Sequence, residues 1–458
     1  MSTREREAVV IGAGLTGLTC AMHLKELGID VEILEKENRI GGLMQTEEVD
    51  SFIFEQGPST GTVKHPEVAE LFDRLGEQCT FEPASVSAEC RLIWKGNRFY
   101  ALPSGLLSAI TTPLFTLKDK LRILGEPWRN KGTDPNESVG SLAERRLGKS
   151  FVDYAVDPFL SGVYAGDPYS LPTRLALPKL YHLEQQYGGF VRGSMALAKK
   201  KKSIRDKRAT KEVFSTVGGF RSLINALGTA VGLDNILLER DNITINLDNG
   251  KYVITCGDEQ IIANYLITTC PSYALPSLLQ FIPQAQLDTL NNLYYAPVIE
   301  IGVGIKHTGN VKWNAFGGLV PSHEKKDILG ILMPSACFTN RSPEGGATYA
   351  YFIGGAKHPE HLNKTDAELE QLVNQSLHLM LGYPQGTCAD VIRIYRHKYA
   401  IPQYTLSTDA RLSTIDTLQQ QHLGLYIAGN LRDGIGMGDR IKQAIDVAEA
   451  IASTKNKA

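Results

Sequence analysis

The first residues of the chain with a clear chemical use are glycines that follow an apolar run. Val9-Val10-Ile11 leads into Gly12-Ala13-Gly14-Leu15-Thr16-Gly17, and Glu35 follows the next apolar run, Val31 to Leu34. Glycines at this spacing permit a tight turn and let a pyrophosphate approach the backbone at the positive end of a helix. Glu35 then stands where a carboxylate can accept hydrogen bonds from a ribose. The pattern predicts a βαβ dinucleotide-binding unit, with a purely structural glycine turn as the alternative.

A second set of glycines distinguishes a flavin from a nicotinamide. Gly41-Gly42 comes shortly after Glu35, where a large flavin lying across the domain needs backbone clearance. Near the other end of the chain, the run Leu425 to Asn430 indicates a strand that enters a glycine-rich loop, Gly434 to Gly438, and an amphipathic helix follows. The N-terminus of that helix could direct partial positive charge at the flavin. We therefore predict bound FAD, although an ordinary packed strand and helix would also explain the second pattern.

Composition restricts the class of protein. The 458 residues suggest two or three domains, and 43% hydrophobic and 21% charged residues are typical of a globular protein. A formal net charge of −2 argues against a nucleic-acid partner. The seven cysteines form no C-x-x-C pair, which favours a reducing compartment without structural zinc. The N-terminus has no apolar signal-peptide core, so we expect a cytoplasmic protein, peripheral at the inner face of the cell membrane if it contacts lipid.

The elements that must position these motifs are spread along the chain. The predicted FAD-binding domain is discontinuous and comprises residues 1–85, 212–270 and 390–458. Between its parts we expect a helical domain over 86–211 and a substrate-binding domain over 271–389. Asp248-Asn249-Gly250 predicts a hairpin, and apolar runs at 298–305, 316–320, 328–333 and 348–353 predict a second, substrate-covering sheet.

Two segments leave alternatives open. Phe99 to Leu117 contains no charged residue, but Pro103 and Pro113 interrupt it, so it cannot easily span a bilayer. It suits a monotopic membrane contact, the lining of an apolar substrate cavity, or a buried loop. The basic segment Arg192 to Lys211 suits a solvated loop or anionic lipid headgroups, and it lacks the aromatic residues that would stack on nucleic acid.

Segments in the middle of the chain resemble one family. Asp157-Pro158-Phe159-Leu160-Ser161-Gly162-Val163-Tyr164-Ala165-Gly166-Asp167-Pro168 is similar to the signature of the oxygen-dependent protoporphyrinogen oxidases and the related coproporphyrinogen III oxidases. Further segments resemble the same family in order, at 54–59, 218–220, 316–322, 328–331, 352–355 and 401–404. The resemblance extends over nearly the full chain.

The resemblance implies an α/β, multidomain fold: a Rossmann-type FAD domain like that of para-hydroxybenzoate hydroxylase, a mixed-sheet substrate domain and a helical domain that contacts membranes in relatives. It implies six-electron oxidation of a porphyrinogen in heme biosynthesis, with molecular oxygen as acceptor and hydrogen peroxide as product. A peripheral membrane contact, a homodimer and handover of product to a ferrochelatase are the further partners that it allows.

The implied site residues fall into two groups. Arg91 would pair with a propionate, Gly162 would leave room near the reacting carbon, and Phe316, Leu319 and Phe352 would hold the macrocycle, although core packing and a surface arginine are the plain alternatives. The residues expected at the cofactor are Gly12, Ala13, Gly14, Leu15, Thr16, Gly17, Glu35, Lys36, Arg39, Gly41, Gly42, Gly57, Pro58, Ser59, Thr60, Ile243, Gly429, Asn430, Gly434, Ile435, Gly436 and Met437.

We expect no catalytic side chain beyond these, because transfer of two electrons to a flavin depends on approach and orientation. We also expect no metal, since His358 and His361 have no third ligand at zinc-site spacing in the sequence. Preference for protoporphyrinogen or coproporphyrinogen stays open. An FAD amine oxidase, a carotenoid desaturase and a flavin-carrying scaffold without turnover are more distant alternatives.

Overall fold

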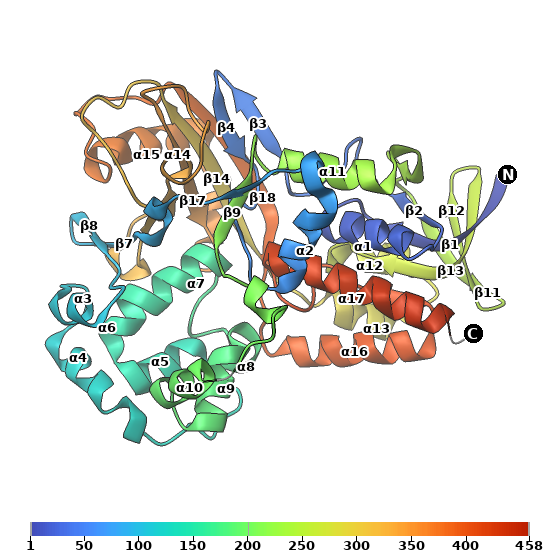
Figure 1. The fold of residues 1–458 in the computed structure, drawn as a ribbon, viewed down its shortest axis with the longest axis horizontal. Coiled ribbons are helices and arrows are strands. Elements are labelled where there is room, and N and C mark those ends of the chain that lie inside the picture. The colour runs from blue at the N-terminus through green and yellow to red at the C-terminus, as the bar shows by residue number, and fades with distance from the viewer. Residues whose placement is uncertain (1, 200, 457–458) are drawn as a thin grey trace.

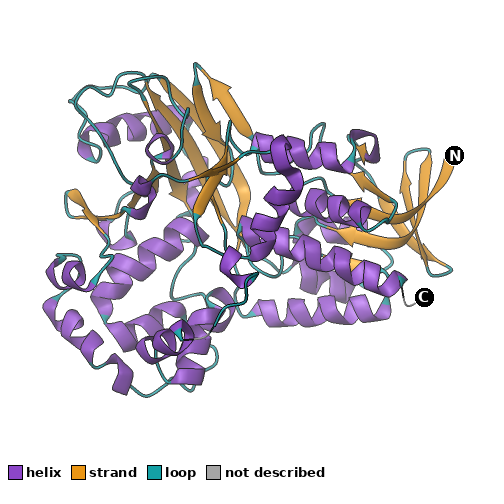
Figure 2. Cartoon of the chain, viewed as in Figure 1, coloured by secondary structure: helices purple, strands orange, loops and turns teal. Residues whose placement is uncertain are grey.

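The computed structural model describes residues 2–199 and 201–456, and two large mixed sheets form its framework (Figures 1 and 2). The first sheet has the order β10-β2-β1-β13-β12-β11, and β19 also pairs with β13. Its strands are β1 (Ser2–Ile11), β2 (Val31–Leu34), β10 (Ile236–Leu237), β11 (Thr244–Asp248), β12 (Lys251–Cys256), β13 (Glu259–Thr268) and β19 (Leu425–Ile427).

Helices cover both faces of the first sheet, because each presents an apolar stripe to it. One buried cluster joins the sheet to α1 (Leu15–Glu26), α2 (Pro66–Leu75), α11 (Arg221–Val231) and α17 (Met437–Lys455). A second cluster joins its other face to α12 (Leu275–Leu278), α13 (Gln284–Asn291) and α16 (Ser407–Gln421). The α/β arrangement predicted from the sequence is confirmed.

The second sheet has the order β18-β14-β17-β16-β15-β7-β8. The strand β14, between β18 and β17, is buried at every residue. The strands are β7 (Arg91–Lys95), β8 (Arg98–Ala101), β14 (Tyr295–Ile305), β15 (Gly317–Leu319), β16 (Ile328–Leu332), β17 (Ala347–Gly354) and β18 (Val391–Pro402). Helices α14 (Pro334–Cys337) and α15 (Asp366–Leu379) lie beside it.

Sheet pairing differs from the sequence-based domain ranges at two places. β7 and β8 belong to the second sheet, although residues 86–211 were expected to be helical, because β7 pairs in parallel with β15. β18 also belongs to it, although residues 390–458 were assigned to the FAD-binding domain, because β18 pairs along β14. The division into three domains otherwise stays a prediction.

The remaining elements connect the two sheets or form the helical region. β3 (Thr46–Val49) pairs with β4 (Phe52–Glu55), and β9 (Val213–Thr216) pairs with β5 (Gly61–Thr62) and β6 (Phe81–Pro83). The helical region contains α3 (Leu106–Thr111), α4 (Leu117–Leu124), α5 (Val139–Leu147), α6 (Lys149–Phe151), α7 (Asp157–Tyr164), α8 (Thr173–Ala176), α9 (Pro178–Tyr187) and α10 (Phe190–Ala198). Figure 1 shows α7 next to the second sheet and α3 and α4 at the outer edge.

Local sequence signals explain several of these elements. The predicted hairpin at Asn249-Gly250 joins β11 to β12, and both turn residues have positive φ, as a two-residue hairpin turn requires. The apolar runs predicted as a second sheet form β14 to β17. Among the described helices, none combines the length and the apolar character needed to cross a bilayer.

The basic segment is not a free loop along its whole length. Arg205 contacts Glu67 and Glu70 at 2.9 and 2.7 Å, and Arg208 pairs with Asp73. All three acids lie on α2, so these arginines attach the segment to the FAD-binding part of the chain. Lys200 lies outside the described residues.

Candidate functional site

The predicted phosphate turn connects β1 to α1. The Gly12 backbone has a φ of 104°, and its N–H donates to Leu34 O at 2.8 Å. A Cβ on Gly17 would lie 2.0 Å from Gly12 O, so helix and turn can pack only because this side chain is missing. A Cβ on Gly14 would meet nothing within 4 Å, and no side chain caps α1. The turn therefore offers open space and uncapped N–H groups, which suits a pyrophosphate.

Glu35 is held against this turn. Its carboxylate is 6% exposed and accepts hydrogen bonds from Ala13 N at 2.7 Å and from Glu37 N at 3.0 Å. Both bonds fix the carboxylate at the carboxyl end of β2, beside the glycine turn. Lys36 is exposed and Arg39 half-buried on the segment that follows.

The Gly41-Gly42 pair packs on the same turn, and Gly57 packs on the loop that follows this pair. Gly41 N donates to Ala13 O at 2.8 Å, and a Cβ on Gly42 would lie 3.3 Å from Gly14 Cα. A Cβ on Gly57 would lie 2.3 Å from Leu43 O. Gly57 is thus packed against the loop that packs against the phosphate turn, and the close approaches at Gly42 and Gly57 depend on a missing side chain.

The C-terminal loop reaches the same edge of the first sheet. β1, β13 and β19 are parallel neighbours, so their carboxyl ends lie together. Thr269, directly after β13, touches both loops: its Oγ1 donates to Gly12 O at 3.2 Å, and a Cβ on Gly429 would lie 3.0 Å from Thr269 O. No sequence motif singles out Thr269, whose only signal is its place at the end of an apolar strand.

Buried polar groups shape the loop after β19. The Tyr404 hydroxyl donates to Asn430 O at 2.9 Å and accepts from Gly434 N at 3.2 Å, and burial raises its pKa to about 12. Arg440 on α17 donates to Gly429 O and to Gln443 Oε1, while its Nε is buried without a partner among the described residues. Tyr404, Arg440 and Gln443 are missing from the sequence-based set, since only tertiary contacts connect them with this loop.

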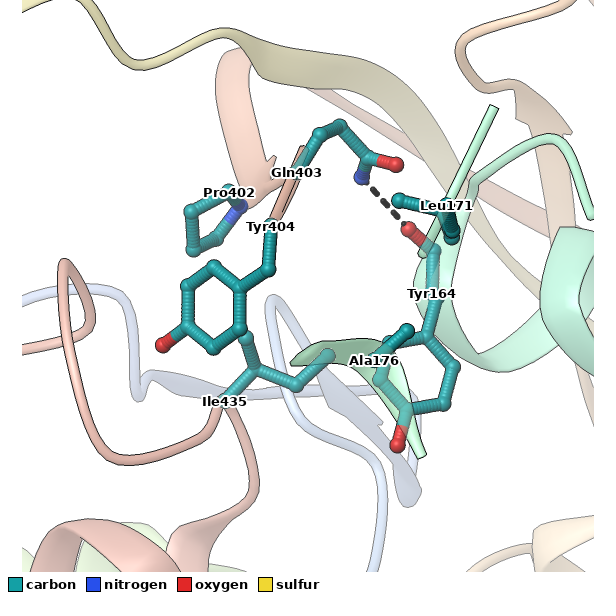
Figure 3. Close-up of a pocket in the computed structure, with 7 residues that line it drawn as sticks. All are labelled: Tyr164, Leu171, Ala176, Pro402, Gln403, Tyr404 and Ile435. Atoms are coloured by element: carbon teal, nitrogen blue, oxygen red, sulfur yellow. Dashed lines mark hydrogen bonds between the residues drawn. The ribbon is translucent and has the colours of Figure 1, made fainter. Parts of the chain in front are cut away.

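These features together fit a flavin dinucleotide. The phosphate turn, Glu35, the stacked glycines and the C-terminal loop come from distant parts of the chain and meet at one edge of one sheet. Of the other residues predicted at the cofactor, Ile243 is buried in the cluster that contains Leu34, and Ile435 lines a small pocket between the C-terminal loop and α7 (Figure 3). In that pocket Gln403 Nε2 donates to Tyr164 O at 2.8 Å.

Two of the residues predicted to hold the substrate stand in one row across the second sheet. Leu319 on β15 is paired with Gly330, and Gly330 with Phe352 on β17. Directly paired residues share a face of the sheet. Gly162 on α7 lies over this face, because a Cβ there would be 2.4 Å from Leu319 Cδ2.

Phe316 and Arg91 lie apart from this row. The exposed Arg91 begins β7, and its Cζ is 5.7 Å from the centre of the Phe316 ring. Phe316 packs with the cluster of Ala88, Cys337 and Phe338, whereas Leu319 packs with Ile93, Leu114 and Phe115. The structure therefore divides the predicted substrate residues into two groups: Leu319, Phe352 and the overlying Gly162 in one, and Arg91 and Phe316 in the other.

A third possible metal ligand, Glu360, lies beside His358 and His361. Ligand atoms of His358, Glu360 and His361 lie within 4.8 Å of one another, because the three residues share the short helical turn that follows β17. His358 and Glu360 are exposed. The absence of a bound metal stays a prediction.

Comparison with known proteins also indicates a flavin-binding protein. Residues 15–452 match the family described as flavin containing amine oxidoreductase. The chain is 29% identical to protoporphyrinogen oxidase 2, chloroplastic/mitochondrial, of Arabidopsis thaliana over 98% of this chain and 94% of that one. It is 24% identical to coproporphyrinogen III oxidase of Bacillus subtilis over 97% of both chains.

Solved structures show the same fold. A protein of Exiguobacterium sp. 255-15, named as a candidate protoporphyrinogen oxidase, superposes with a TM-score of 0.81 at 22% identity and covers 99% of this chain and 100% of its own. Cyclohexylamine oxidase of Brevibacterium oxydans superposes with a TM-score of 0.71 at 17% identity, over 99% of this chain and 100% of its own. The predicted cofactor, FAD, is confirmed by these relationships.

Proposed function

The chain belongs to the family of flavin-containing amine oxidoreductases, and from this premise we propose that it is an FAD-dependent, oxygen-dependent oxidase of protoporphyrinogen IX. The observation that carries the proposal is the placement of Leu319 and Phe352 in one row beneath Gly162. A row of apolar side chains suits the apolar face of a tetrapyrrole. The named relatives and the ordered family segments support the same substrate class.

The electron balance of the reaction defines what the site must do. Protoporphyrinogen IX would lose six electrons and six protons in three equal steps, and three molecules of oxygen would leave as three of hydrogen peroxide. FAD supplies the two-electron acceptor for each step. The residues of this chain then have to orient the macrocycle, exclude water and bind the propionates, with Arg91 offering two parallel hydrogen bonds to a carboxylate.

Coproporphyrinogen III is the alternative substrate, because a relative with this activity matches nearly the whole chain. Purified FAD-loaded protein should be mixed anaerobically with each porphyrinogen, and bleaching of the flavin absorbance should be followed over time. We expect faster bleaching with protoporphyrinogen IX. Faster bleaching with coproporphyrinogen III would reverse the substrate assignment, and bleaching by neither would reject the function.

A peripheral membrane contact is part of the proposal. On α4, Leu117, Leu121 and Leu124 recur at helical spacing and are 73%, 59% and 68% exposed. An amphipathic helix normally turns such a stripe toward the protein core. Leu107, Ile110 and Trp128 are exposed on the neighbouring α3 and on the turn after α4, so the apolar surface continues beyond one helix. We propose that this surface rests on a bilayer.

Sedimentation with phospholipid vesicles tests this contact. The wild type should sediment with the vesicles, and Leu121→Glu together with Leu124→Glu should abolish sedimentation while FAD content and porphyrinogen oxidation stay unchanged. Equal sedimentation of both proteins would refute the contact. The homodimer, the handover to a ferrochelatase and the cytoplasmic location stay predictions of the sequence.

A further inference from the structure

Glu300 is a buried carboxyl group on β14, an interior strand of the second sheet. Glu300 is only 2% exposed, and every other residue of β14 is also buried. A lone ionised carboxylate in such a place is costly, so a buried acid requires a physical explanation. The proposed oxidation does not by itself supply one.

The position of Glu300 connects the two halves of the site. On one side it is paired across the strands with Phe352, which continues the row of Leu319 and Gly330. On the other side it is paired with Tyr395 of β18. The Ser59 hydroxyl donates to Glu300 Oε1 at 2.9 Å, and Ser59 belongs to the 57–60 segment that packs toward the phosphate turn.

From this geometry we propose that Glu300 is a positioning residue for the flavin, which fixes the Ser59 hydroxyl and holds a proton at the Ser59 side of the proposed cofactor site. The inference rests on the proposed placement of Ser59 at the cofactor, and it adds a titratable group that the sequence analysis did not expect. A neutral carboxyl adds no negative charge next to a ring system that gains electrons. An ionised one would oppose reduction through unscreened Coulomb repulsion.

The surroundings favour the neutral form. Burial raises the pKa of Glu300 well above its ordinary value, the Ser59 hydrogen bond lowers it, and the nearby Glu55 raises it further. Burial also raises the pKa of Glu55 on β4 to about 7. Glu55 is therefore the competing titratable group, and it accepts hydrogen bonds from Phe220 N at 2.9 Å and from Thr46 Oγ1 at 2.8 Å.

The other titratable and charged groups around Glu300 either pair with other residues or are buried in the neutral form. Tyr395 donates to Glu47 Oε2 at 2.6 Å, and Arg393 pairs with the same carboxylate at 2.9 Å. Burial lowers the pKa of His397, which is two residues along β18. Arg341 pairs with Glu82, and the short helical turn Pro359–Asn363, which also packs on β14, carries Glu360 and His361.

A spectral titration of the FAD-loaded protein tests the proposal. The visible absorbance of the oxidised flavin and its reduction potential are measured between about pH 5 and 9 for the wild type, E300Q, E55Q and S59A. We expect one transition in the wild type, above the ordinary range for glutamate. E300Q should lose it and E55Q, the matched control for a nearby buried acid, should keep it.

The potentials should follow the same pattern. Below the transition the wild type and E300Q should have equal potentials, and above it the wild type should be the harder to reduce. Retention of the transition in E300Q or its loss in E55Q would overturn the proposal. A wild type that is harder to reduce than E300Q at every pH would also overturn it, because Glu300 would then already be ionised.

S59A supplies an independent measurement that does not require E300Q to fold. Since the hydroxyl stabilises the ionised carboxylate, its removal should raise the pH of the transition, and an unchanged midpoint would contradict the proposal. None of these measurements uses a porphyrinogen. A failure of the substrate assignment and a failure of the Glu300 assignment therefore give different results.

Discussion

Gly162 and Leu319 touch where helix α7 crosses strand β15. A Cβ built on Gly162 would lie 2.4 Å from Leu319 Cδ2, so the Leu319 side chain can occupy its position only because Gly162 has no side chain. The sequence-based expectation was that Gly162 leaves room for the reacting carbon. In the structure that room is shared with Leu319, which is itself a predicted substrate contact.

Gly162→Ala should therefore act through Leu319. The added methyl group must displace the leucine side chain, which is flexible, so we expect the loss of stability to be about 1–3 kcal/mol. Displacement of a substrate contact should reduce kcat/KM for the porphyrinogen by roughly tenfold, with FAD content unchanged. Steady-state oxygen uptake and thermal unfolding measure the two effects, and wild-type kinetics would remove α7 from the substrate site.

Gly14→Val and Gly17→Val should fail in different ways. A Cβ at position 14 would meet nothing within 4 Å, so the variant should fold and yet lack FAD because the pyrophosphate is crowded. A side chain at position 17 would collide with Gly12 O at 2.0 Å, so that variant should not fold. Circular dichroism and the ratio of flavin to protein absorbance distinguish the two. A fully loaded Gly14→Val protein would contradict the predicted pyrophosphate position.

Arg91→Ala tests the proposed propionate contact. Loss of a charge-assisted hydrogen bond should weaken the binding free energy of the substrate by on the order of 1.5–3 kcal/mol. KM should therefore rise roughly 10-fold to 150-fold, with little change in kcat. Arg98→Ala is the matched control, because this exposed arginine on the adjacent β8 lies 4.5 Å from the Tyr100 ring instead of beside Phe316. If both variants show the same kinetics, Arg91 has no specific part in binding.

Arg146→Ala should destabilise the helical region. Arg146 is fully buried between Glu126 Oε1 at 2.6 Å and Glu184 Oε1 at 2.5 Å. Removal of the cation leaves the buried Glu126 with only the backbone N–H groups of Phe190 and Val191, and Glu184 with only Arg145 at 2.8 Å. Breaking such a buried pair from one side should cost about 3–5 kcal/mol of unfolding free energy. Arg174→Ala, which breaks a more exposed pair with Asp409, should cost less than about 1 kcal/mol. Urea unfolding followed by circular dichroism compares them, and equal midpoints would argue against this ion-pair network.

Local sequence patterns were sufficient for the parts of the molecule that depend on neighbouring residues. The glycine turn at Gly12, the hairpin at Asn249-Gly250 and the apolar strands of both sheets follow from backbone conformation and from runs of apolar residues. The same patterns predicted an FAD domain assembled from both ends of the chain. The family resemblance then contributed the class of substrate.

Only the tertiary structure decided which distant residues meet. Thr269 lies between Gly12 and Gly429 because β13 is the central neighbour of β1 and β19. Glu300 lies between Phe352 and Tyr395 because the register of β14 with β17 and β18 places it there. Strand order and register depend on the free energy of packing the whole chain, and a shift of one residue would turn Glu300 to the opposite face of the sheet. For this reason no local motif could have identified either residue.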